Sequence, residues 1–376
     1  MIFSKTKTIL FCDNTLWGLL NFRGDVIKHF ILKGYKVVLC APNDEDAQMR
    51  VVIPQGVDCV PISMGRTSKN PLNDVLYFFR LRRVLRKFRP DYVFTYTIKP
   101  NIYGSVLSHI CHCPVTAMMA GMGFAFTNKN LVSFIARSLY KLSLRYCNHL
   151  LILNEDNKRI LLEKKIISCD KIILLDGGEG VNLEKFPFFN NQSEHTTFVF
   201  IGRLLWDKGY DEFSRAAREI KKTYPEVSFE LWGSLDPSYP DSVPQERIIR
   251  DESDGILTYK GFTHNISEIY HRGGIVVVLP SFYGEGLNRS LMEACASGKP
   301  IITTNIAGCR ETVENGKNGF LIPVHDSKAL ADAMLKYLTL SDSQKEFFSH
   351  YSRLIAENKF NINKVYEIYD SLVERF

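Results

Sequence analysis

Short apolar runs alternate with helix-forming segments along most of the chain, and this alternation restricts the possible folds more than any other feature. The runs are rich in Val, Ile, Leu and Phe, and the segments between them carry apolar residues at helical spacing. Strands separated by helices pair in parallel, so the pattern predicts doubly wound α/β sheets. The predicted strands are 8–11, 36–39, 92–95, 115–118 and 150–153, then 198–201, 229–232, 256–259, 275–279 and 301–303, and the predicted helices of the first half are 25–33, 72–88 and 132–146.

The length of the chain and one break in this pattern predict two domains. A chain of 376 residues exceeds what a single hydrophobic core usually serves. The alternation lapses in the polar segment 187–196, which we interpret as a linker. We therefore expect Rossmann-like domains over residues 1–186 and 187–358, facing each other across a cleft at the carboxyl ends of their strands. Residues 359–376 carry apolar side chains at helical spacing and are expected to form a final helix.

The composition indicates a cytoplasmic protein that holds no metal. The first twelve residues predict a strand rather than a signal peptide, and no apolar stretch is long enough to predict a membrane span. The nine cysteines are scattered, as in a reducing compartment. The cluster Cys111-His112-Cys113 lacks a second pair of ligands at metal-binding spacing, and Asp44-Glu45-Asp46 is interpreted as a solvated loop.

Glu285 and Glu293 belong to a segment that predicts a strand, a glycine-rich turn and a helix. At a rise of about 1.5 Å per residue, the two backbone positions are expected about 12 Å apart along the helix axis. Paired glycosidase carboxylates lie only about 5 to 9.5 Å apart, so that role is excluded. The spacing instead suits two contacts with an extended ligand whose anionic centre rests at the helix N-terminus.

Two cations follow the strand 198–201 in the segment Gly202-Arg203-Leu204-Leu205-Trp206-Asp207-Lys208-Gly209. Gly202 is expected to allow a sharp turn at the strand end. Arg203 and Lys208 then lie just before a predicted helix, where a planar guanidinium and an ammonium can clamp a diphosphate. The alternative is a pair of solvated loop cations. The two glutamates in the same domain favour the clamp.

These motifs together resemble family 4 retaining glycosyltransferases of the GT-B fold, in the branch that assembles bacterial surface polysaccharides on polyprenyl diphosphate. The resemblance spans nearly the whole chain. It implies two Rossmann-like domains and a last helix, 359–376, that crosses back to the first domain. The motifs that carry it are Gly202-Arg203 with Lys208-Gly209, the pair Glu285 and Glu293, Gly308-Cys309-Arg310-Glu311, and Asn315-Gly316-Lys317-Asn318-Gly319-Phe320.

The resemblance also implies roles for individual residues. Arg203 and Lys208 would bind the donor diphosphate and stabilise the departing nucleotide, and Glu293 would accept from the ribose hydroxyls. Glu285 would hold hydroxyls of the transferred sugar and counts with the two cations as catalytic. Backbone N–H groups of the next residues would assist it, and no protein nucleophile or general base is required. These donor-binding residues are Gly202, Arg203, Lys208, Glu285, Gly286, Leu287, Asn288 and Glu293.

Asn288 departs from the family pattern, which usually has proline or a small residue after Glu-Gly-Leu. Its side-chain amide could contact the donor sugar and influence donor choice. Asn is also a favoured residue at the start of a helix, and both readings are open.

The first domain contributes weaker candidates for acceptor binding. Arg23 is expected in the turn after the first strand, and Lys99 just before a helix. Gly121 and Gly123 bracket a loop after a strand, where a ligand could approach the backbone. For each, an ordinary surface cation or turn is the alternative.

Charge is divided unevenly between the two halves of the chain. Residues 1–185 hold 26 Lys and Arg against 15 Asp and Glu, whereas the remainder holds 21 against 26. The segment 76–89 mixes aromatic and basic residues on one predicted helix, a pattern typical of contact with an anionic membrane surface. The alternative helix packs Leu76, Phe79, Val84 and Phe88 inward and solvates its arginines. The chain has no recognisable nucleic-acid module. The predicted membrane residues are Arg80, Arg82, Arg83, Arg86, Lys87 and Arg89.

The leading hypothesis is a retaining glycosyltransferase on the inner face of the cell membrane. It would move a sugar, possibly an N-acetylhexosamine, from a UDP-sugar to a polyprenyl-diphosphate-linked saccharide without a metal or other cofactor. The alternatives are a nucleotide-sugar epimerase or a phosphorylase of the same fold, and a noncatalytic nucleotide-sugar-binding subunit. An oxidoreductase is not favoured, because no close Gly-x-Gly-x-x-Gly turn follows the first strand.

Overall fold

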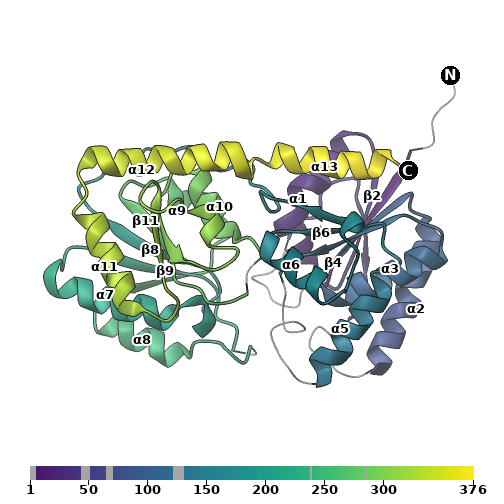
Figure 1. The fold of residues 1–376 in the computed structure, drawn as a ribbon, viewed down its shortest axis with the longest axis horizontal. Coiled ribbons are helices and arrows are strands. Elements are labelled where there is room, and N and C mark those ends of the chain that lie inside the picture. The colour runs from purple at the N-terminus through teal and green to yellow at the C-terminus, as the bar shows by residue number, and fades with distance from the viewer. Residues whose placement is uncertain (1–5, 44–50, 65–70, 122–130, 238, 285) are drawn as a thin grey trace. The chain divides into compact units, whose positions relative to one another are not determined.

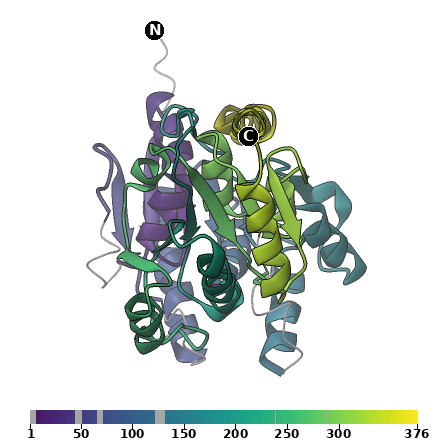
Figure 2. The same ribbon diagram turned by 90° about the vertical axis from the view of Figure 1, so that its left-hand side faces the viewer.

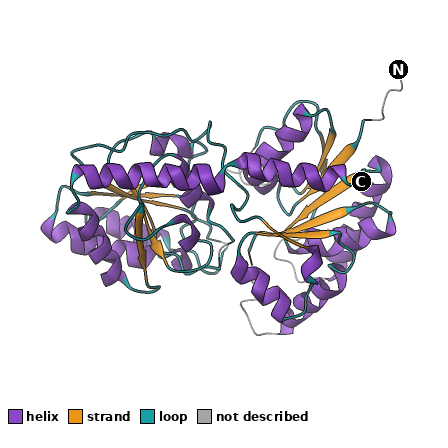
Figure 3. Ribbon diagram, turned by 45° about the horizontal axis from the view of Figure 1, so that its top comes forward, coloured by secondary structure: helices purple, strands orange, loops and turns teal. Residues whose placement is uncertain are grey.

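The computed structural model describes residues 6–43, 51–64, 71–121, 131–237, 239–284 and 286–376. The chain divides into two compact units, each built on one parallel sheet (Figures 1 and 3). The first unit combines Met1–Glu179 with Asn363–Phe376, and the second is Gly180–Ile362. The prediction of two doubly wound Rossmann-like domains is confirmed.

The sheet of the first unit has seven parallel strands in the order β3-β2-β1-β4-β5-β6-β7. The central strands are fully buried, as their continuous apolar runs predict. The two edge strands, β3 and β7, were not predicted, because they are short and only half-buried. The strands are β1 (Thr8–Cys12), β2 (Lys36–Ala41), β3 (Asp58–Pro61), β4 (Tyr92–Tyr96), β5 (Val115–Met119), β6 (His149–Ile152) and β7 (Ile172–Leu174).

Helices cover both faces of this sheet (Figure 1). One face carries α1 and the C-terminal helix α13, and the other carries the four helices that follow β3 to β6. The core on that second face is formed by apolar side chains of the strands together with Tyr77, Leu81, Tyr140 and Leu144. The helices are α1 (Leu16–Leu32), α2 (Pro71–Phe88), α3 (Ile98–Ile110), α5 (Leu131–Ser143), α6 (Glu155–Glu163) and α13 (Ile362–Glu374).

Helix α1 begins at Leu16, well before the position 25 that the apolar spacing indicated. Thr15 is its N-cap and accepts a hydrogen bond from the Gly18 backbone N–H at 2.9 Å. A side-chain cap of this kind satisfies one of the free donors at a helix start. The consequence is that Arg23 lies inside the helix, so its predicted place in a turn is wrong.

The second unit repeats the doubly wound design with six strands in the order β10-β9-β8-β11-β12-β13. Its sheet lies between helices on both sides (Figures 1 and 2). The strands are β8 (Thr197–Ile201), β9 (Ser228–Trp232), β10 (Thr258–Gly261), β11 (Ile275–Leu279), β12 (Ile301–Thr304) and β13 (Gly319–Ile322). The helices are α7 (Tyr210–Thr223), α8 (Gln245–Ser253), α9 (Ile266–Tyr270), α10 (Arg289–Ala296), α11 (Ser327–Leu338) and α12 (Asp342–Ile355).

The last helix returns to the first unit, as predicted. Asp370 of α13 pairs at 3.0 Å with Lys33, the residue directly after α1, and lies 3.0 Å from His29 of α1. The buried Tyr369 hydroxyl lies 3.1 Å from the hydroxyl of Tyr96 at the end of β4. Apolar burial along one side of α13 therefore belongs to the core of the first unit.

The polar segment 187–196, expected to be a linker, is bound to the second unit. The Asn191 side chain accepts from the Ile275 backbone N–H at 3.0 Å and donates to the Ile275 carbonyl at 2.9 Å. The fully buried Lys299 ammonium donates to Asn191 and to the carbonyls of Phe189 and Arg272. The change of unit therefore lies at Glu179–Gly180, ahead of the expected boundary after residue 186.

Lys299 makes the stability of the protein depend on pH. Burial lowers the pKa of Lys299 to about 7 from 10.5. Between these values the unfolded chain binds the proton and the folded chain does not, so the free energy of unfolding rises with pH. We expect a contribution of up to about 1.4 kcal/mol per pH unit. Denaturant unfolding from pH 7 to 8.5 should show this slope, whereas above about 8.5 cysteines of the unfolded chain also titrate.

Lys299→Met should remove this rise, and the exposed Lys328→Met should keep it. Parallel pH profiles of the wild type and Lys299→Met would contradict the assignment.

Candidate active site

Two loops at the carboxyl ends of the neighbouring strands β8 and β11 form the candidate site. The backbone N–H groups of Phe282 and Tyr283 both donate to the Asp207 carbonyl, at 2.8 and 3.0 Å. The Ser281 hydroxyl donates to the same oxygen at 3.2 Å. Three donors on one carbonyl hold the loop after β11 against the loop that carries Arg203 and Lys208.

Gly209 makes this close approach of the two loops possible. It has a φ of 85°, and a Cβ at this position would overlap the Pro280 carbonyl. Gly209 also ends the 3₁₀ turn Trp206–Lys208 and begins α7. Only glycine satisfies both the backbone conformation and the contact.

The backbone at Gly202 requires a glycine at the neighbouring position 233 and not at position 202 itself. A Cβ at Gly202 would meet only ordinary contacts, the nearest being Leu279 and Phe200 at 3.8 Å. A Cβ at Gly233, directly after β9, would overlap the Gly202 carbonyl. Gly233 was not predicted, and its position immediately after the strand 229–232 is the signal that could have indicated it.

Arg203 and Lys208 lie beside the same aromatic ring. The Lys208 Nζ lies 4.9 Å from the centre of the Tyr283 ring, and the Arg203 guanidinium lies 5.8 Å from it. Arg203 also lies 5.1 Å from the Tyr239 ring, in the loop after β9. Burial and the neighbouring Tyr283 phenol raise the pKa of Tyr239. The structure thus brings the two predicted cations together and adds two tyrosines that sequence reasoning missed.

Exposure differs between the two cations. Arg203 is exposed, whereas Lys208 is only 7% exposed. The Lys208 ammonium lies over the face of the Tyr283 ring, a position that favours a cation. This pair can attract an anion, with Arg203 reaching outward and Lys208 acting from beneath.

The N-terminus of α10 lies next to this loop pair. The Ser290 hydroxyl donates to the Ile201 carbonyl at the end of β8, at 3.1 Å. The Asn288 side-chain oxygen caps the helix by accepting from the Leu291 N–H, and the Asn288 N–H donates to the Gly308 carbonyl at 2.8 Å. The structure therefore shows the helix-start role of Asn288. Gly286 and Leu287, both buried, lead into this cap.

Glu293 lies in the second turn of α10 and is 7% exposed. Its Oε1 accepts from Arg289 Nε at 2.8 Å, an (i, i+4) pair that the sequence spacing could have indicated. The helix begins at Arg289, so the estimate of Glu285 and Glu293 on one continuous helix is wrong. Glu285 itself lies outside the described residues.

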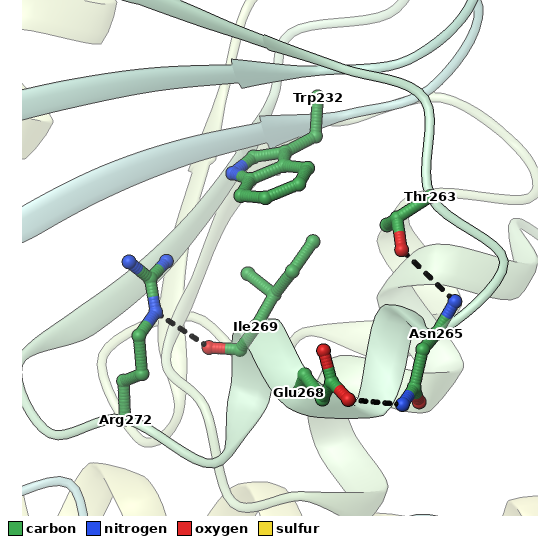
Figure 4. A pocket seen from close by; sticks show the side chains of 6 residues that line it. All are labelled: Trp232, Thr263, Asn265, Glu268, Ile269 and Arg272. Atoms are coloured by element: carbon green, nitrogen blue, oxygen red, sulfur yellow. Dashed lines mark hydrogen bonds between the residues drawn. The ribbon is translucent and has the colours of Figure 1, made fainter.

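A small cavity of about 230 Å³ lies elsewhere in the second unit, between β9 and α9 (Figure 4). Glu230 fixes its wall by bonding Arg272 at 2.9 and 2.7 Å and Trp232 at 2.9 Å. The volume is below the roughly 300 to 1,000 Å³ of ordinary ligand pockets. None of the predicted donor-binding residues lines it, the lining being Trp232, Thr263, Asn265, Glu268, Ile269 and Arg272.

In the first unit, Arg23 is buried among anionic and aromatic groups. Its guanidinium pairs with Glu179 at 2.6 Å and with Asp13 at 3.5 Å, and it lies 4.4 Å from the Tyr96 ring. Burial lowers the pKa of Arg23, but Glu179 and Asp13 outweigh this effect and raise it. Arg23 thus joins α1 to the end of the first unit, and only its alternative reading as a surface cation is wrong.

The other candidates of the first unit are partly accessible. Lys99, at the start of α3, pairs with Asp74 of α2 at 2.7 Å. Gly121 follows β5 and is half-buried, and Gly123 lies outside the described residues. Five of the predicted membrane residues are exposed and Arg82 is half-buried. Among the helices of the described ranges, none has the length and apolarity needed to cross a bilayer.

Two doubly wound parallel units with a last helix returning to the first define the GT-B class of glycosyltransferase folds. Solved structures of this class superpose on nearly the whole chain. HepE of Anabaena, solved in complex with UDP-glucose, matches with a TM-score of 0.77 at 16% identity, over 98% of this chain and 100% of that one.

The family models identify the chain within this class. The model described as Glycosyltransferase Family 4 matches residues 24–178, and the model described as Glycosyl transferases group 1 matches residues 182–353. The chain belongs to the family 4 glycosyltransferases and is an enzyme of the sugar-transferring class.

Two bacterial relatives that align with most of the chain are named as sugar transferases that act on undecaprenol-diphosphate-linked sugars. The N,N'-diacetylbacillosaminyl-diphospho-undecaprenol alpha-1,3-N-acetylgalactosaminyltransferase of Campylobacter jejuni is 28% identical, over 84% of this chain and 87% of its own length. The UDP-Gal:alpha-D-GlcNAc-diphosphoundecaprenol alpha-1,3-galactosyltransferase of Escherichia coli is 26% identical, over 80% and 81%.

Gly209→Ala should separate the two loops of the site. The new methyl group would overlap the Pro280 carbonyl, so we expect a destabilisation of about 2 kcal/mol or more and a marked loss of nucleotide affinity. Gly255→Ala is the matched control, because Gly255 also has a positive φ, 69°, but meets no atom within 4 Å. Calorimetric unfolding and UDP titration measure both effects. Equal losses in the two variants would mean that only the backbone conformation matters.

Proposed function

We propose that this glycosyltransferase moves a sugar from a UDP-sugar to a polyprenyl-diphosphate-linked saccharide with retention of anomeric configuration. The observation that carries the proposal is the placement of Arg203 and Lys208 around Tyr283, next to the N-terminus of α10. The named acceptors of the Campylobacter and Escherichia coli relatives, and the UDP-glucose bound to HepE, support the substrate classes.

Arg203 and Lys208 would bind the donor diphosphate. Breaking the anomeric bond places charge on the departing phosphate, and cations already held in place stabilise that charge more in the transition state than in the ground state. The three hydrogen bonds to the Asp207 carbonyl supply this fixed placement. With two cations and a helix N-terminus available, the proposed reaction requires no metal ion or other cofactor.

The remaining donor contacts would follow α10. Glu293 would accept from the ribose hydroxyls, and Glu285 with the backbone of Gly286 and Leu287 would hold the transferred sugar. Capping uses the Asn288 oxygen, so any contact of Asn288 with that sugar falls to its Nδ2 group. Donor choice between hexoses and N-acetylhexosamines would be decided in this short segment.

The acceptor would reach the enzyme through the basic first unit. Its lipid anchor would place the reaction at a membrane surface, which we propose to be the inner face of the cell membrane. There Arg80, Arg82, Arg83, Arg86, Lys87 and Arg89 would meet anionic headgroups. Lys99, the backbone near Gly121 and Arg23 are the candidates for acceptor contact within the described residues, and Glu179 and Asp13 hold Arg23 in place.

Removing either cation should slow the chemical step. Arg203→Ala and Lys208→Ala are each expected to lower kcat by about a hundredfold, because charge on the leaving phosphate loses a partner. Steady-state kinetics with the cognate donor measure this change. Lys328→Ala, an exposed cation of the same unit, is the control. Unchanged kinetics in both site variants would refute the clamp.

The ribose contact can be isolated by a cycle of two changes. Wild-type enzyme should bind UDP at least tenfold more tightly than its 2′,3′-dideoxy analogue, because a charged acceptor contributes about 1.5 kcal/mol or more. In Glu293→Gln the difference should shrink to a few-fold at most. Calorimetric titration gives the four affinities. An undiminished preference in the variant would place the ribose elsewhere.

The substrate classes are tested by a donor and acceptor screen followed by mass spectrometry and NMR. Sugar transfer to a lipid diphosphate saccharide, with an α product from an α-linked donor, is the expected result. Turnover of donor without acceptor would indicate an epimerase. Dependence on inorganic phosphate would indicate a phosphorylase. Binding without turnover of any donor would indicate a noncatalytic subunit.

A further inference from the structure

A third loop, which follows β9, lies against the loop that carries Arg203. In the sheet of the second unit β8 lies between β9 and β11, so the loop after β8 begins between the other two. The loops after β9 and β11 each carry one tyrosine beside the candidate site, Tyr239 and Tyr283. Both tyrosines thus reach Arg203 from neighbouring strands of one sheet.

Backbone hydrogen bonds fasten the loop after β9 to the loop after β8. Leu204 donates its N–H to the Ser234 carbonyl at 3.1 Å. The Leu204 carbonyl in turn accepts from the Val243 N–H at 3.0 Å. These bonds involve both ends of the loop after β9, so Tyr239 belongs to a segment that the backbone holds in place.

Asp207 joins all three loops through its backbone. Its N–H donates to the Asp241 carboxylate at 2.8 Å, and the preceding N–H, of Trp206, donates to the Asp241 carbonyl at 3.0 Å. Its carbonyl accepts the hydrogen bonds from the loop after β11. The two loops that carry tyrosines are therefore fastened to the one segment that separates Arg203 from Lys208.

The Arg203 guanidinium has an aromatic ring from each of these loops beside it. Its Cζ lies 5.1 Å from the centre of the Tyr239 ring and 5.8 Å from that of Tyr283. Both distances fall within the range of about 6 Å over which an aromatic ring attracts a cation. The two tyrosines are half-buried and Arg203 is exposed, so fixed rings contact a side chain that otherwise has solvent around it.

Tyr239 meets Arg203 as a neutral phenol. Burial and the neighbouring Tyr283 phenol raise the pKa of Tyr239, so it keeps its proton at neutral pH. Without the ion pair that a phenolate would form, the ring is its main source of attraction for the cation. An arginine held by two rings has already lost rotamer freedom that it would otherwise lose on binding an anion.

We propose that Tyr239 and Tyr283 are positioning residues of the transfer reaction, whose rings hold the Arg203 guanidinium in place before the donor arrives. Neither ring has to touch the donor for this effect. Charge that develops on the leaving diphosphate then meets a cation that needs no reorganisation. The proposal deepens the proposed function and rests on it for the identity of the anion.

Steady-state kinetics separate the ring of Tyr239 from its hydroxyl. Tyr239→Leu removes the ring and should lower kcat about tenfold, with a smaller change in the KM for the donor. Tyr239→Phe keeps the ring and should retain roughly half of the wild-type kcat or more. The same two substitutions at Tyr283 should give the same order.

Tyr351→Leu is the matched control, because the Tyr351 ring lies 5.2 Å from the Lys317 Nζ, and this variant should keep the wild-type kcat. Wild-type kcat in Tyr239→Leu would overturn the proposal. Equal losses in Tyr239→Phe and Tyr239→Leu would also overturn it, because the hydroxyl and not the ring would then be the active group.

A double-mutant cycle shows whether Tyr239 acts through Arg203. In the Arg203→Ala background, Tyr239→Leu should cause no further fall in kcat, because the cation that the ring positions is absent. A further fall of about tenfold in that background would show that Tyr239 acts on the substrate directly, and this result would overturn the proposal.

NMR of the full-length protein without donor measures the position of the Arg203 side chain directly. Ring currents of the two tyrosines should shift the Arg203 Nε–H signal, which Arg203→Lys assigns by its loss, and the order parameter of this group should be high. Tyr239→Leu and Tyr283→Leu should each move the signal and lower the order parameter, and Tyr351→Leu should do neither. An unchanged signal and order parameter in both site variants would overturn the proposal.

These measurements distinguish failure of the ring contact from failure of the proposed function. The NMR measurement needs no substrate, so an unchanged Arg203 signal counts against the ring contact alone. A wild-type enzyme that turns over no UDP-sugar, with an Arg203 side chain that loses its order in the two Leu variants, counts against the proposed function alone.

Discussion

The contact between the loop after β8 and the loop after β11 is the constraint on which the rest of the site depends. One carbonyl, that of Asp207, receives three hydrogen bonds from the Ser281–Tyr283 segment, and Gly209 lets the backbone pass beside Pro280 without a Cβ in the way. This contact brings the Tyr283 ring to Arg203 and Lys208. It also aligns the N-terminus of α10 with the end of β8 through Ser290. The proposed diphosphate site needs fixed cations, and here backbone contacts hold the loops that carry them.

The first unit uses buried charge for a different purpose. Arg23, Asp13 and Glu179 form an ion-pair cluster under Tyr96 and Tyr369, and Glu179 is the last residue before the chain enters the second unit. The cluster links α1, the end of β4 and the returning helix α13 to Glu179, at which the chain leaves the first unit. Removing one partner of such a pair leaves an uncompensated buried charge, which strongly destabilises the fold.

Sequence reasoning succeeded where one local pattern decides the structure. Buried parallel strands have continuous apolar runs, so the central strands of both sheets were predicted, whereas the short edge strands β3, β7 and β13 were not. Arg203 and Lys208 were predicted to lie together because cations between a strand and a helix are visible in sequence, and both lie beside the Tyr283 ring. Tyr239 and Gly233 were missed because they follow another strand, β9, and reach the site only through sheet order. Arg23 was misplaced because the Thr15 cap lengthens α1 beyond its apolar pattern.

By itself, the sequence determined the fold class, the family and the chemical types at the donor site, because strand and helix periodicity and motif spacing are local properties of the chain. Only the tertiary structure decided which of those residues meet. The parallel order β9-β8-β11 brings three loops that lie far apart in sequence to one edge, and close backbone contacts at Gly209 and Gly233 set their separation. Exposure was likewise decided by packing: Arg23 and Phe79 differ in polarity, yet the core encloses the cation and leaves the ring in solvent. The burial of a side chain depends on which elements pack against its helix or strand. The hydrophobic periodicity of the sequence does not specify those elements.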